Sequence, residues 1–159
     1  MMKKIFVTLC AVLFAVTFIS AQAASIKKTA VAVVNNSALI GRWVNVNPKT
    51  RGIDKIIIKQ NSHGGLLINS FGKCEPTDCV WGNVALKTFS KSPANGNMIY
   101  GLAVWKLHYP NWPANVFIDN TMTIKKQNAN EIRITTFTVF KDRSGRSNYV
   151  SNATLKIVK

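Results

Sequence analysis

The last third of the chain alternates apolar and polar residues with a period of two. Ile118, Met122 and Ile124 alternate with polar residues, and residues 131–141 and 149–157 repeat the pattern. Successive side chains of a β-strand point to opposite faces, so this period gives each segment one apolar and one polar face. The pattern therefore predicts three strands that each cover a core with one face, and it restricts the fold more than any other feature.

Five further strands are predicted upstream. Short β-branched or aromatic runs are separated there by turn residues such as Asn47-Pro48 and Gly64-Gly65. The runs cover residues 39–46, 53–60, 66–71, 81–89 and 98–109. No segment shows a convincing amphipathic helix. About eight strands joined by short loops predict an all-β, antiparallel up-and-down barrel. A barrel of about eight strands is just wide enough to be filled by side chains or to hold one small ligand.

The N-terminal residues have the composition of a secretory leader. Lys3 and Lys4 precede an apolar run at residues 5–19, and small residues that a signal peptidase accepts end at Ala23. Such a run with such a cleavage site is typical of a signal peptide, which we favour over a single anchoring helix. The expected organisation is a signal peptide at residues 1–23, a lead-in at 24–37 and a single barrel domain at 38–159. We expect an exported monomer without an integral membrane span.

Two cysteines, Cys74 and Cys79, enclose the sequence Glu-Pro-Thr-Asp in the middle of the predicted barrel. In an exported chain, neighbouring cysteines normally pair, and a short segment with a proline suits a tight turn between them. A redox dithiol usually has about two residues between its cysteines, and a zinc site needs further ligands. The histidines His63 and His108 show no paired spacing. We therefore predict a structural disulfide over a redox or metal site, and we expect no cofactor.

Two groups of motifs resemble known proteins. The sequence Gly-Arg-Trp at residues 41–43 is similar to the Gly-x-Trp motif of lipocalin-like (calycin) barrels, in which the tryptophan plugs one end. Three segments resemble small exported bacterial proteins that share a Gly-Lys-Cys-x-Pro-Thr-Asp-Cys-x-Trp-Gly core, here at residues 72–82, with further matches at 142–149 and 51–53. The first likeness implies a barrel. The second implies a periplasmic or secreted bacterial protein, and it implies no catalytic residue.

Residues that would support catalysis are scattered along the chain. No Gly-x-Ser-x-Gly nucleophile motif is present, and the histidines lie in a glycine-rich loop and at a strand end. Glycoside hydrolysis needs a pair of carboxylates, and no such pair is evident in the sequence. The possibility that the fold brings Asp119 and Glu131 together stays open. We therefore predict a protein that is not an enzyme and has no catalytic residues.

Large aromatic residues favour a binding role. In a hollow barrel they would line or plug a cavity for a small apolar or amphipathic ligand, whereas in a solid barrel they would form the core. Both versions stay open, and we expect Trp81 to act as a plug beside the disulfide. The candidate lining residues are Trp43, Trp81, Trp105, Tyr100 and Phe117. The first functional hypothesis is an exported barrel that carries or senses such a ligand.

The charge of the chain supports an alternative function. Lysine and arginine number 21 against 6 aspartate and glutamate residues, which gives a net charge of +15. A chain this basic is attracted to acidic glycans, nucleic acids and anionic envelope or host surfaces. A basic stripe would form if neighbouring strands aligned Lys55, Lys59, Lys125, Arg133 and Lys141. Binding of this kind would weaken steeply with salt, unlike the binding of an apolar ligand.

The turn at residues 142–146 has two interpretations. In the first, Arg143 and Arg146 present a fork to a carboxylate or a phosphate. In the second, Asp142 bonds to the amides of its own turn, and Gly145 supplies a positive φ. We favour the second interpretation and keep the two arginines as candidate anion-binding residues.

Overall fold

The computed structural model describes residues 35–108, 113, 117–142 and 144–159. The chain divides into two compact units, Met1–Ala30 and Val31–Lys159, and every described residue belongs to the second. The predicted signal peptide at residues 1–23 and most of the lead-in therefore lie outside the described residues. Within the described ranges, no helix is long and apolar enough to cross a membrane.

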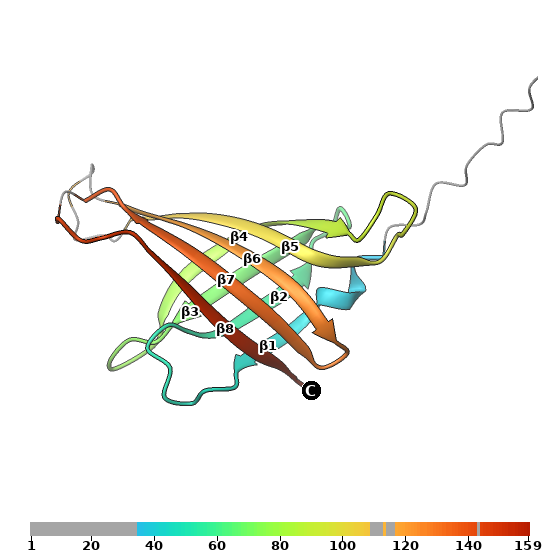
Figure 1. Ribbon diagram of the computed structural model, residues 1–159, viewed down its shortest axis with the longest axis horizontal. Helices are drawn as coiled ribbons and strands as arrows, with labels where there is room; N and C mark the ends of the chain where they lie inside the picture. Colours follow the sequence, from blue (N-terminus) through green and yellow to red (C-terminus); the bar gives the residue numbers. More distant parts are fainter. Residues whose placement is uncertain (1–34, 109–112, 114–116, 143) are drawn as a thin grey trace, which may run out of the picture. The chain divides into compact units, whose positions relative to one another are not determined.

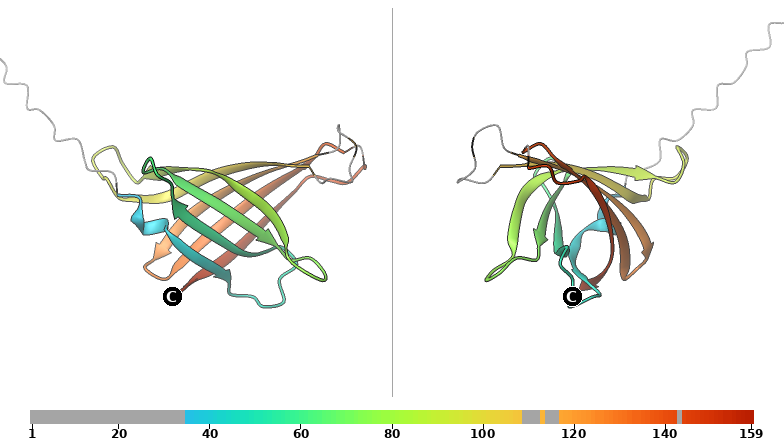
Figure 2. Two further views of the ribbon diagram at one scale, coloured as in Figure 1. Left: turned by 180° about the vertical axis from the view of Figure 1, so that it is seen from behind. Right: turned by 60° about the vertical axis from the view of Figure 1, so that its left-hand side comes forward.

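Eight strands close into one antiparallel barrel (Figures 1 and 2). Each strand pairs with the next one in the chain, and β8 returns to pair with β1. A 3-10 turn η1 (Ser37–Leu39) precedes the strands β1 (Gly41–Asn45), β2 (Ile53–Gln60), β3 (Leu66–Gly72), β4 (Cys79–Ser90), β5 (Met98–Leu107), β6 (Ile118–Asn128), β7 (Glu131–Phe140) and β8 (Tyr149–Val158). The predicted all-β barrel is confirmed, and the likeness to lipocalins stays a prediction.

Large aliphatic side chains fill the half of the barrel beneath η1. They include Ile56, Ile58, Leu66, Ile68, Ile124, Ile132, Ile134 and Leu155. Trp43 lies among them without exposed surface, and its Nε1–H donates to the carbonyl of Leu39, 3.0 Å away. The ammonium of Lys126 lies 5.1 Å from the centre of the Trp43 ring and donates to the carbonyl of Ala38. This half of the barrel is therefore a solid core.

Towards the other end, buried polar side chains join the apolar ones in the interior. On β7, the buried Ile134 is followed in the same phase by Thr136 and Thr138, which are buried as well. Asn120 of β6, opposite Thr138 in register, and Ser70, near the end of β3, are also buried. Polar side chains from three strands thus meet inside the barrel at the end that carries the two cysteines.

The barrel wall is incomplete beside β8. β1 pairs only with residues 155–158 of β8, whereas β7 pairs with β8 as far as Tyr149. The last backbone bond on the β1 side runs from the N–H of Val46 to the carbonyl of Thr154, over 3.0 Å. Residues 149–153 of β8 therefore have no neighbouring strand on that side within the described part of the chain (Figure 1).

Candidate functional site at the disulfide end of the barrel

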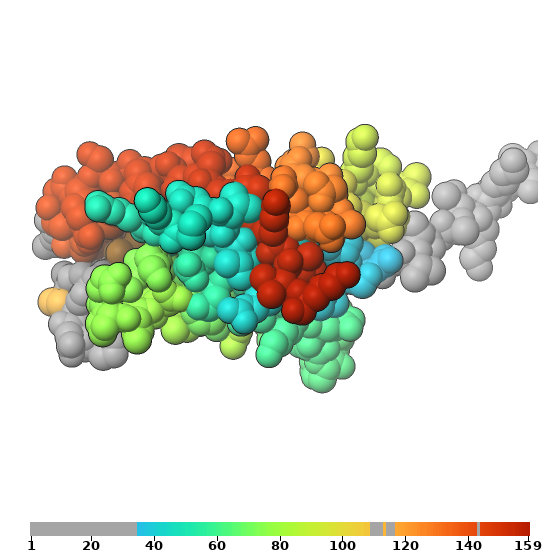
Figure 3. All heavy atoms as spheres, turned by 90° about the horizontal axis from the view of Figure 1, so that it is seen from below, coloured from blue at the N-terminus to red at the C-terminus, as the bar shows by residue number. Residues whose placement is uncertain are grey.

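A cavity of about 130 Å³ lies at the polar end of the barrel. Three parts of the chain line it: residues 51–53 at the start of β2, residues 72–74 with Cys79 and Trp81, and Thr136, Thr138, Tyr149 and Ser151 of β7 and β8. Figure 3 shows the teal atoms around residue 50 and the green atoms of the cysteine corner on one face, beside the orange-red atoms of β7 and β8. We call this hollow the disulfide-end cavity.

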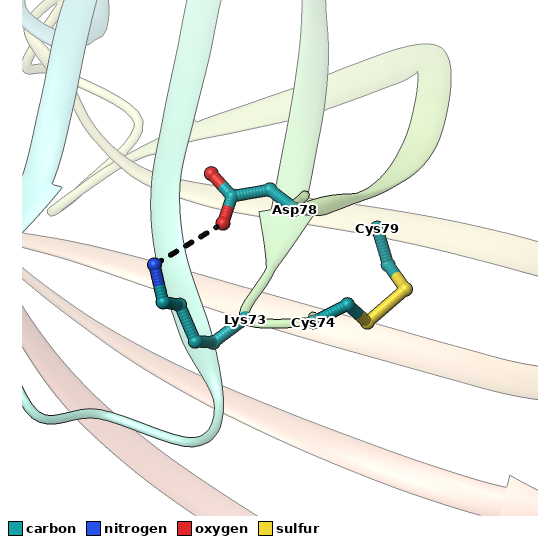
Figure 4. Close-up of a disulfide and its surroundings, with 4 residues drawn as sticks. All are labelled: Lys73, Cys74, Asp78 and Cys79. Atoms are coloured by element: carbon teal, nitrogen blue, oxygen red, sulfur yellow. Dashed lines mark ion pairs between the residues drawn. A yellow bond between two sulfur atoms is a disulfide. The ribbon is translucent and has the colours of Figure 1, made fainter. Parts of the chain in front are cut away.

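The corner beside the cavity is held by a covalent bond and by ion pairs. Cys74 and Cys79 form the predicted disulfide, with their Cα atoms 5.5 Å apart. The carboxylate of Asp78 accepts a hydrogen bond from Lys55 Nζ at 2.6 Å and lies 3.6 Å from Lys73 Nζ (Figure 4). The hydrogen bond from Lys55 is the largest cause of the lowered pKa of Asp78. Asp78 is therefore charged near neutral pH and is held mainly by Lys55.

Removal of the disulfide should loosen this corner without unfolding the barrel. Serine at both Cys74 and Cys79 is expected to lower the free energy of unfolding by about 2 kcal/mol, because so short a loop restricts the unfolded chain only modestly. Much of the apolar core, including Trp43, Ile132 and Leu155, lies away from this corner and stays intact. Chemical denaturation of the variant and of the wild type measures the difference. Loss of the β-sheet signal in circular dichroism at room temperature would contradict this expectation.

Two buried hydroxyl groups at this end have no hydrogen-bond partner among the described residues. Thr136, which lines the cavity, is 2% exposed and its Oγ1 is unpaired, as is the Oγ of the fully buried Ser70. By contrast, the Oγ1–H of Thr138 donates to Asn120 Oδ1 at 2.7 Å. Buried polar groups are normally paired, because an unpaired one costs about 1–3 kcal/mol. Of the two residues, only Thr136 lines the cavity, and its hydroxyl marks the cavity as a place for a group with polar atoms.

Trp81 forms the apolar wall of the cavity. Its ring centre lies 5.5 Å from that of the buried Trp105 in an edge-to-face arrangement, and Trp105 Nε1–H donates to the carbonyl of Gly82 at 3.0 Å. Gly72 allows this packing, since a Cβ at that position would lie 3.3 Å from Trp81 Nε1. Trp81 is only partly buried and lines the hollow, so its ring provides an apolar surface to a ligand.

Of the five aromatic residues predicted to line an interior cavity, the three tryptophans belong to the interior, and Tyr100 and Phe117 do not. Tyr100 pairs in register with Phe89, which is 49% exposed, and with the exposed Lys125, and paired residues face the same side of a sheet. Phe117 lies against the exposed Lys106, whose Nζ is 4.1 Å from the ring centre. The prediction was wrong for these two residues, which lie on the outer face.

The turn at residues 142–146 is closed by its own side chains. Asp142 accepts hydrogen bonds from the N–H of Ser144 at 3.1 Å and from its hydroxyl at 2.6 Å, and the guanidinium of Arg146 pairs with the same carboxylate. Gly145 has a φ of +71°, a conformation that favours glycine. The favoured interpretation, in which Asp142 organises its own turn, fits this geometry.

The alternative role of the turn as an anion fork does not fit. The charge of Arg146 is used by Asp142, and its guanidinium also lies 3.9 Å from the centre of the Phe140 ring. Arg143 lies outside the described residues. Arg146 is therefore not carried forward as an anion-binding residue, and the candidate role of Arg143 stays a prediction.

Asp142 should stay ionised to low pH. Hydrogen bonds from Ser144, and after them from Arg146, lower the pKa of Asp142 to about 2. A carboxyl whose pKa is lower in the folded state stabilises that state above the unfolded value, and this contribution is lost as the pH falls from about 4 through about 2. Ser144→Ala removes the largest cause, so the pKa of Asp142 should rise towards the ordinary value. A ¹³C NMR titration of the carboxyl group checks this, and an unchanged midpoint would disprove it.

The predicted stripe of basic side chains is divided by ion pairs. Lys55 belongs to the disulfide corner, and Lys141 pairs with Asp119 at 2.7 Å. Lys125 and Arg133 lie opposite each other on β6 and β7, and neither forms an ion pair within the described residues. The outer face therefore keeps a smaller basic patch around these two side chains.

The candidate catalytic carboxylates do not meet. Asp119 lies opposite Val139, and Glu131 lies opposite Asn128 at the other end of the β6–β7 hairpin. Across the described ranges, no group of three or more histidine, cysteine, aspartate or glutamate side chains gathers in a way that would hold a metal ion.

A larger hollow lies at the η1 end of the barrel. It measures about 670 Å³ and includes Asn35, Ser37, Gln60 and His63 in its lining. These side chains are exposed, and some of their polar groups bond to one another, as Ser37 does to Asn35 at 2.6 Å. No lining residue of this hollow has a buried unpaired polar atom. The disulfide-end cavity is therefore the better candidate for a site.

No protein-family model matches the chain, and no curated protein or solved structure resembles it at a significant level. The case for the cavity accordingly rests on its own geometry. The sequence prediction included Trp81 but missed Thr136 and Ser151. One signal was readable: Thr136 continues the phase of the apolar residues on its strand, so a hydroxyl had to enter the interior.

Proposed function

We propose that this protein is an exported, non-catalytic binding protein that holds a small amphipathic group in the disulfide-end cavity. The observation that carries the proposal is the buried, unpaired hydroxyl of Thr136, a residue that lines the same hollow as Trp81. A hydroxyl offers hydrogen bonds to polar atoms of a ligand, and an indole ring offers an apolar contact surface. Binding sites of small ligands combine such surfaces.

The volume of the cavity limits what it accepts. Pockets for drug-sized molecules usually measure about 300 to 1,000 Å³, and an apolar cavity of about 150 Å³ holds benzene. The disulfide-end cavity, at about 130 Å³, is closer to the second value. The other half of the interior is filled by aliphatic side chains and Trp43. We therefore propose a bound group of roughly six non-hydrogen atoms and no large apolar cargo.

Filling the cavity should abolish binding. Ser151 lines the cavity, whereas the preceding residue, Val150, is 55% exposed on the outer face. We expect Ser151→Leu to remove the binding of small amphipathic fragments, because the added side chain occupies their place. Val150→Leu is the matched control, since it adds volume outside the barrel. NMR shifts of the backbone amides of Gly72 and Thr136 report binding, with alcohols, amides and short carboxylates as probes.

Two results would refute the proposed function. One is that none of the fragments shifts the amides around the cavity. The other is binding that persists in Ser151→Leu, which would place the ligand elsewhere. A thermal melt of each variant confirms folding, and Ser151→Val provides a smaller filling substitution if the leucine variant does not fold.

A second candidate function rests on the outer face. Register places Phe89, Tyr100, Lys125 and Arg133 in one row across β4 to β7. The exposed ring of Phe89 and the partly buried ring of Tyr100 lie beside cations without ion pairs among the described residues, and this suits an acidic glycan, which offers charges and ring faces together. Reversal of both charges, Lys125→Glu with Arg133→Glu, should abolish retention on a sulfated glycan column while fragment binding persists. Unchanged retention would exclude this second function.

A further inference from the structure

The open stretch of β8 presents unpaired backbone groups. Successive residues of an antiparallel strand direct their N–H and C=O groups to opposite sides. The carbonyl of Thr154 accepts from Val46 on the β1 side, so Asn152 and Val150 direct their backbone groups to that side as well. No described residue bonds to these groups. β8 therefore offers the N–H and C=O groups of both residues to an incoming strand.

The disulfide-end cavity lies where an added strand would place an inward side chain. Paired residues of a ladder face the same side of the sheet. Ser151 faces inward and lines the cavity, so a residue opposite Ser151 would project into the same hollow. Since β1 ends at Asn45, no described residue stands opposite Ser151 on that side. A volume of about 130 Å³ suits a single side chain.

The charge of the lining selects an acidic side chain. Arg51 and Lys73 line the cavity, and no carboxylate of the described residues does. Arg51 forms no ion pair within the described residues. Lys73 is 43% exposed and lies 3.6 Å from Asp78, whose closer partner is Lys55 at 2.6 Å. Its ammonium is therefore able to turn to another carboxylate while Asp78 keeps a counter-ion.

We propose that the partner is an extended peptide segment of another protein, which pairs with residues 149–153 of β8 and inserts an aspartate or glutamate side chain into the disulfide-end cavity. This inference rests on the proposed function, because it names the group that fills the same cavity. Backbone hydrogen bonds supply affinity in strand addition, and the side-chain pocket supplies specificity. The hydroxyl of Thr136 donates to the inserted carboxylate, and Arg51 and Lys73 neutralise its charge.

Proline at position 150 tests the backbone pairing. Val150→Pro removes the N–H that faces the open side, and it leaves the bonds to β7, which come from the neighbouring residues. Val150→Thr is the matched control, because it keeps the N–H and changes the same exposed side chain. The probe is a display library of random heptapeptides, selected on the disulfide-bonded protein and then synthesised. We expect selected peptides with an acidic residue between β-formers, and about tenfold weaker binding to Val150→Pro alone.

A second pair of variants tests the charge. Arg51→Gln should weaken peptide binding about tenfold, whereas Arg42→Gln, which removes an exposed charge from β1, should not. Equal effects of the two would show general attraction and overturn the charge assignment.

Other outcomes are equally decisive. Peptides that bind Val150→Pro as tightly as the wild type, or that lack acidic residues, would overturn the inference. If the peptides fail these tests but small fragments still bind in the cavity, the proposed function stands without the peptide inference. If neither fragments nor peptides bind, the proposed function and the inference are both refuted. Self-association in the ultracentrifuge that Val150→Pro abolishes would assign the open edge to a second copy of the chain and overturn the choice of a foreign peptide.

Discussion

Trp43→Ala will lower the free energy of unfolding by about 3 to 5 kcal/mol, the usual cost of removing a large aromatic side chain from a core. Trp43 has no exposed surface, its indole donates to Leu39, and the ammonium of Lys126 lies over its ring. The substitution therefore removes apolar burial and loosens η1 from the end of the barrel. Small domains are stable by about 5 to 15 kcal/mol, so this one change removes a large share of the total.

Two variants give this prediction its controls. Trp43→Phe keeps an aromatic ring and loses only part of the volume and the bond to Leu39, so its cost should be well below that of the alanine variant. Phe89→Ala removes an aromatic side chain that is 49% exposed, and it should change stability by no more than about 0.5 kcal/mol. Chemical denaturation followed by circular dichroism measures all three. Equal costs for Trp43→Ala and Phe89→Ala would show that Trp43 does not anchor the core.

The strands and the disulfide were predictable because their signals are local. Residues 53–60 and their β-branched side chains were predicted as a strand, and β2 has those bounds. Cys74 and Cys79 stand so near each other in the chain that a turn alone brings them together. Closure of the barrel followed from the number of strands and the short loops between them.

The inward face of β5 was not predictable in the same way. Leu102 and Val104 lie on its outer face, while the small residues Gly101 and Ala103 face inward with Trp105. Both faces of this strand are apolar, so alternation does not distinguish them. The register also shifts between Phe89 and Ser90 on the neighbouring strand. The size and apolar character of Tyr100 therefore predicted an inward side chain, whereas its register with Phe89 and Lys125 places it on the outer face.

The cavity was not predictable from the sequence because it depends on contacts between strands that are far apart in the chain. Thr136 and Ser151 become neighbours through the register of β7 and β8, and Gly72 joins them from β3. The open wall depends on where β1 ends, and strand ends carry a weak signal in sequence. The sequence shows hydroxyl residues at positions where the alternation predicts an apolar side chain. It does not show which of these hydroxyls lacks a hydrogen-bond partner in the fold.

Thr136→Val should raise the free energy of unfolding and weaken ligand binding at the same time. The hydroxyl of Thr136 is buried and unpaired within the described residues. The free-energy cost of removing it from water is therefore not offset by a hydrogen bond in the folded state. Valine keeps the shape and removes that cost, and we expect a gain of about 1 kcal/mol. The same hydroxyl is proposed to bond to the occupant of the cavity, so affinity for fragments or peptides should fall about tenfold.

Thr138→Val is the matched control, because Thr138 lies on the same face of the same strand and its hydroxyl is paired. It donates to Asn120, which is 2% exposed, so the substitution leaves a buried amide oxygen without a partner. We expect a loss of about 1 to 3 kcal/mol, opposite in sign to the effect at Thr136. Chemical denaturation of both variants without ligand, followed by NMR titration, separates stability from binding. If Thr136→Val also loses stability, its hydroxyl has a partner in the folded protein, and the observation that carries the proposed function is gone.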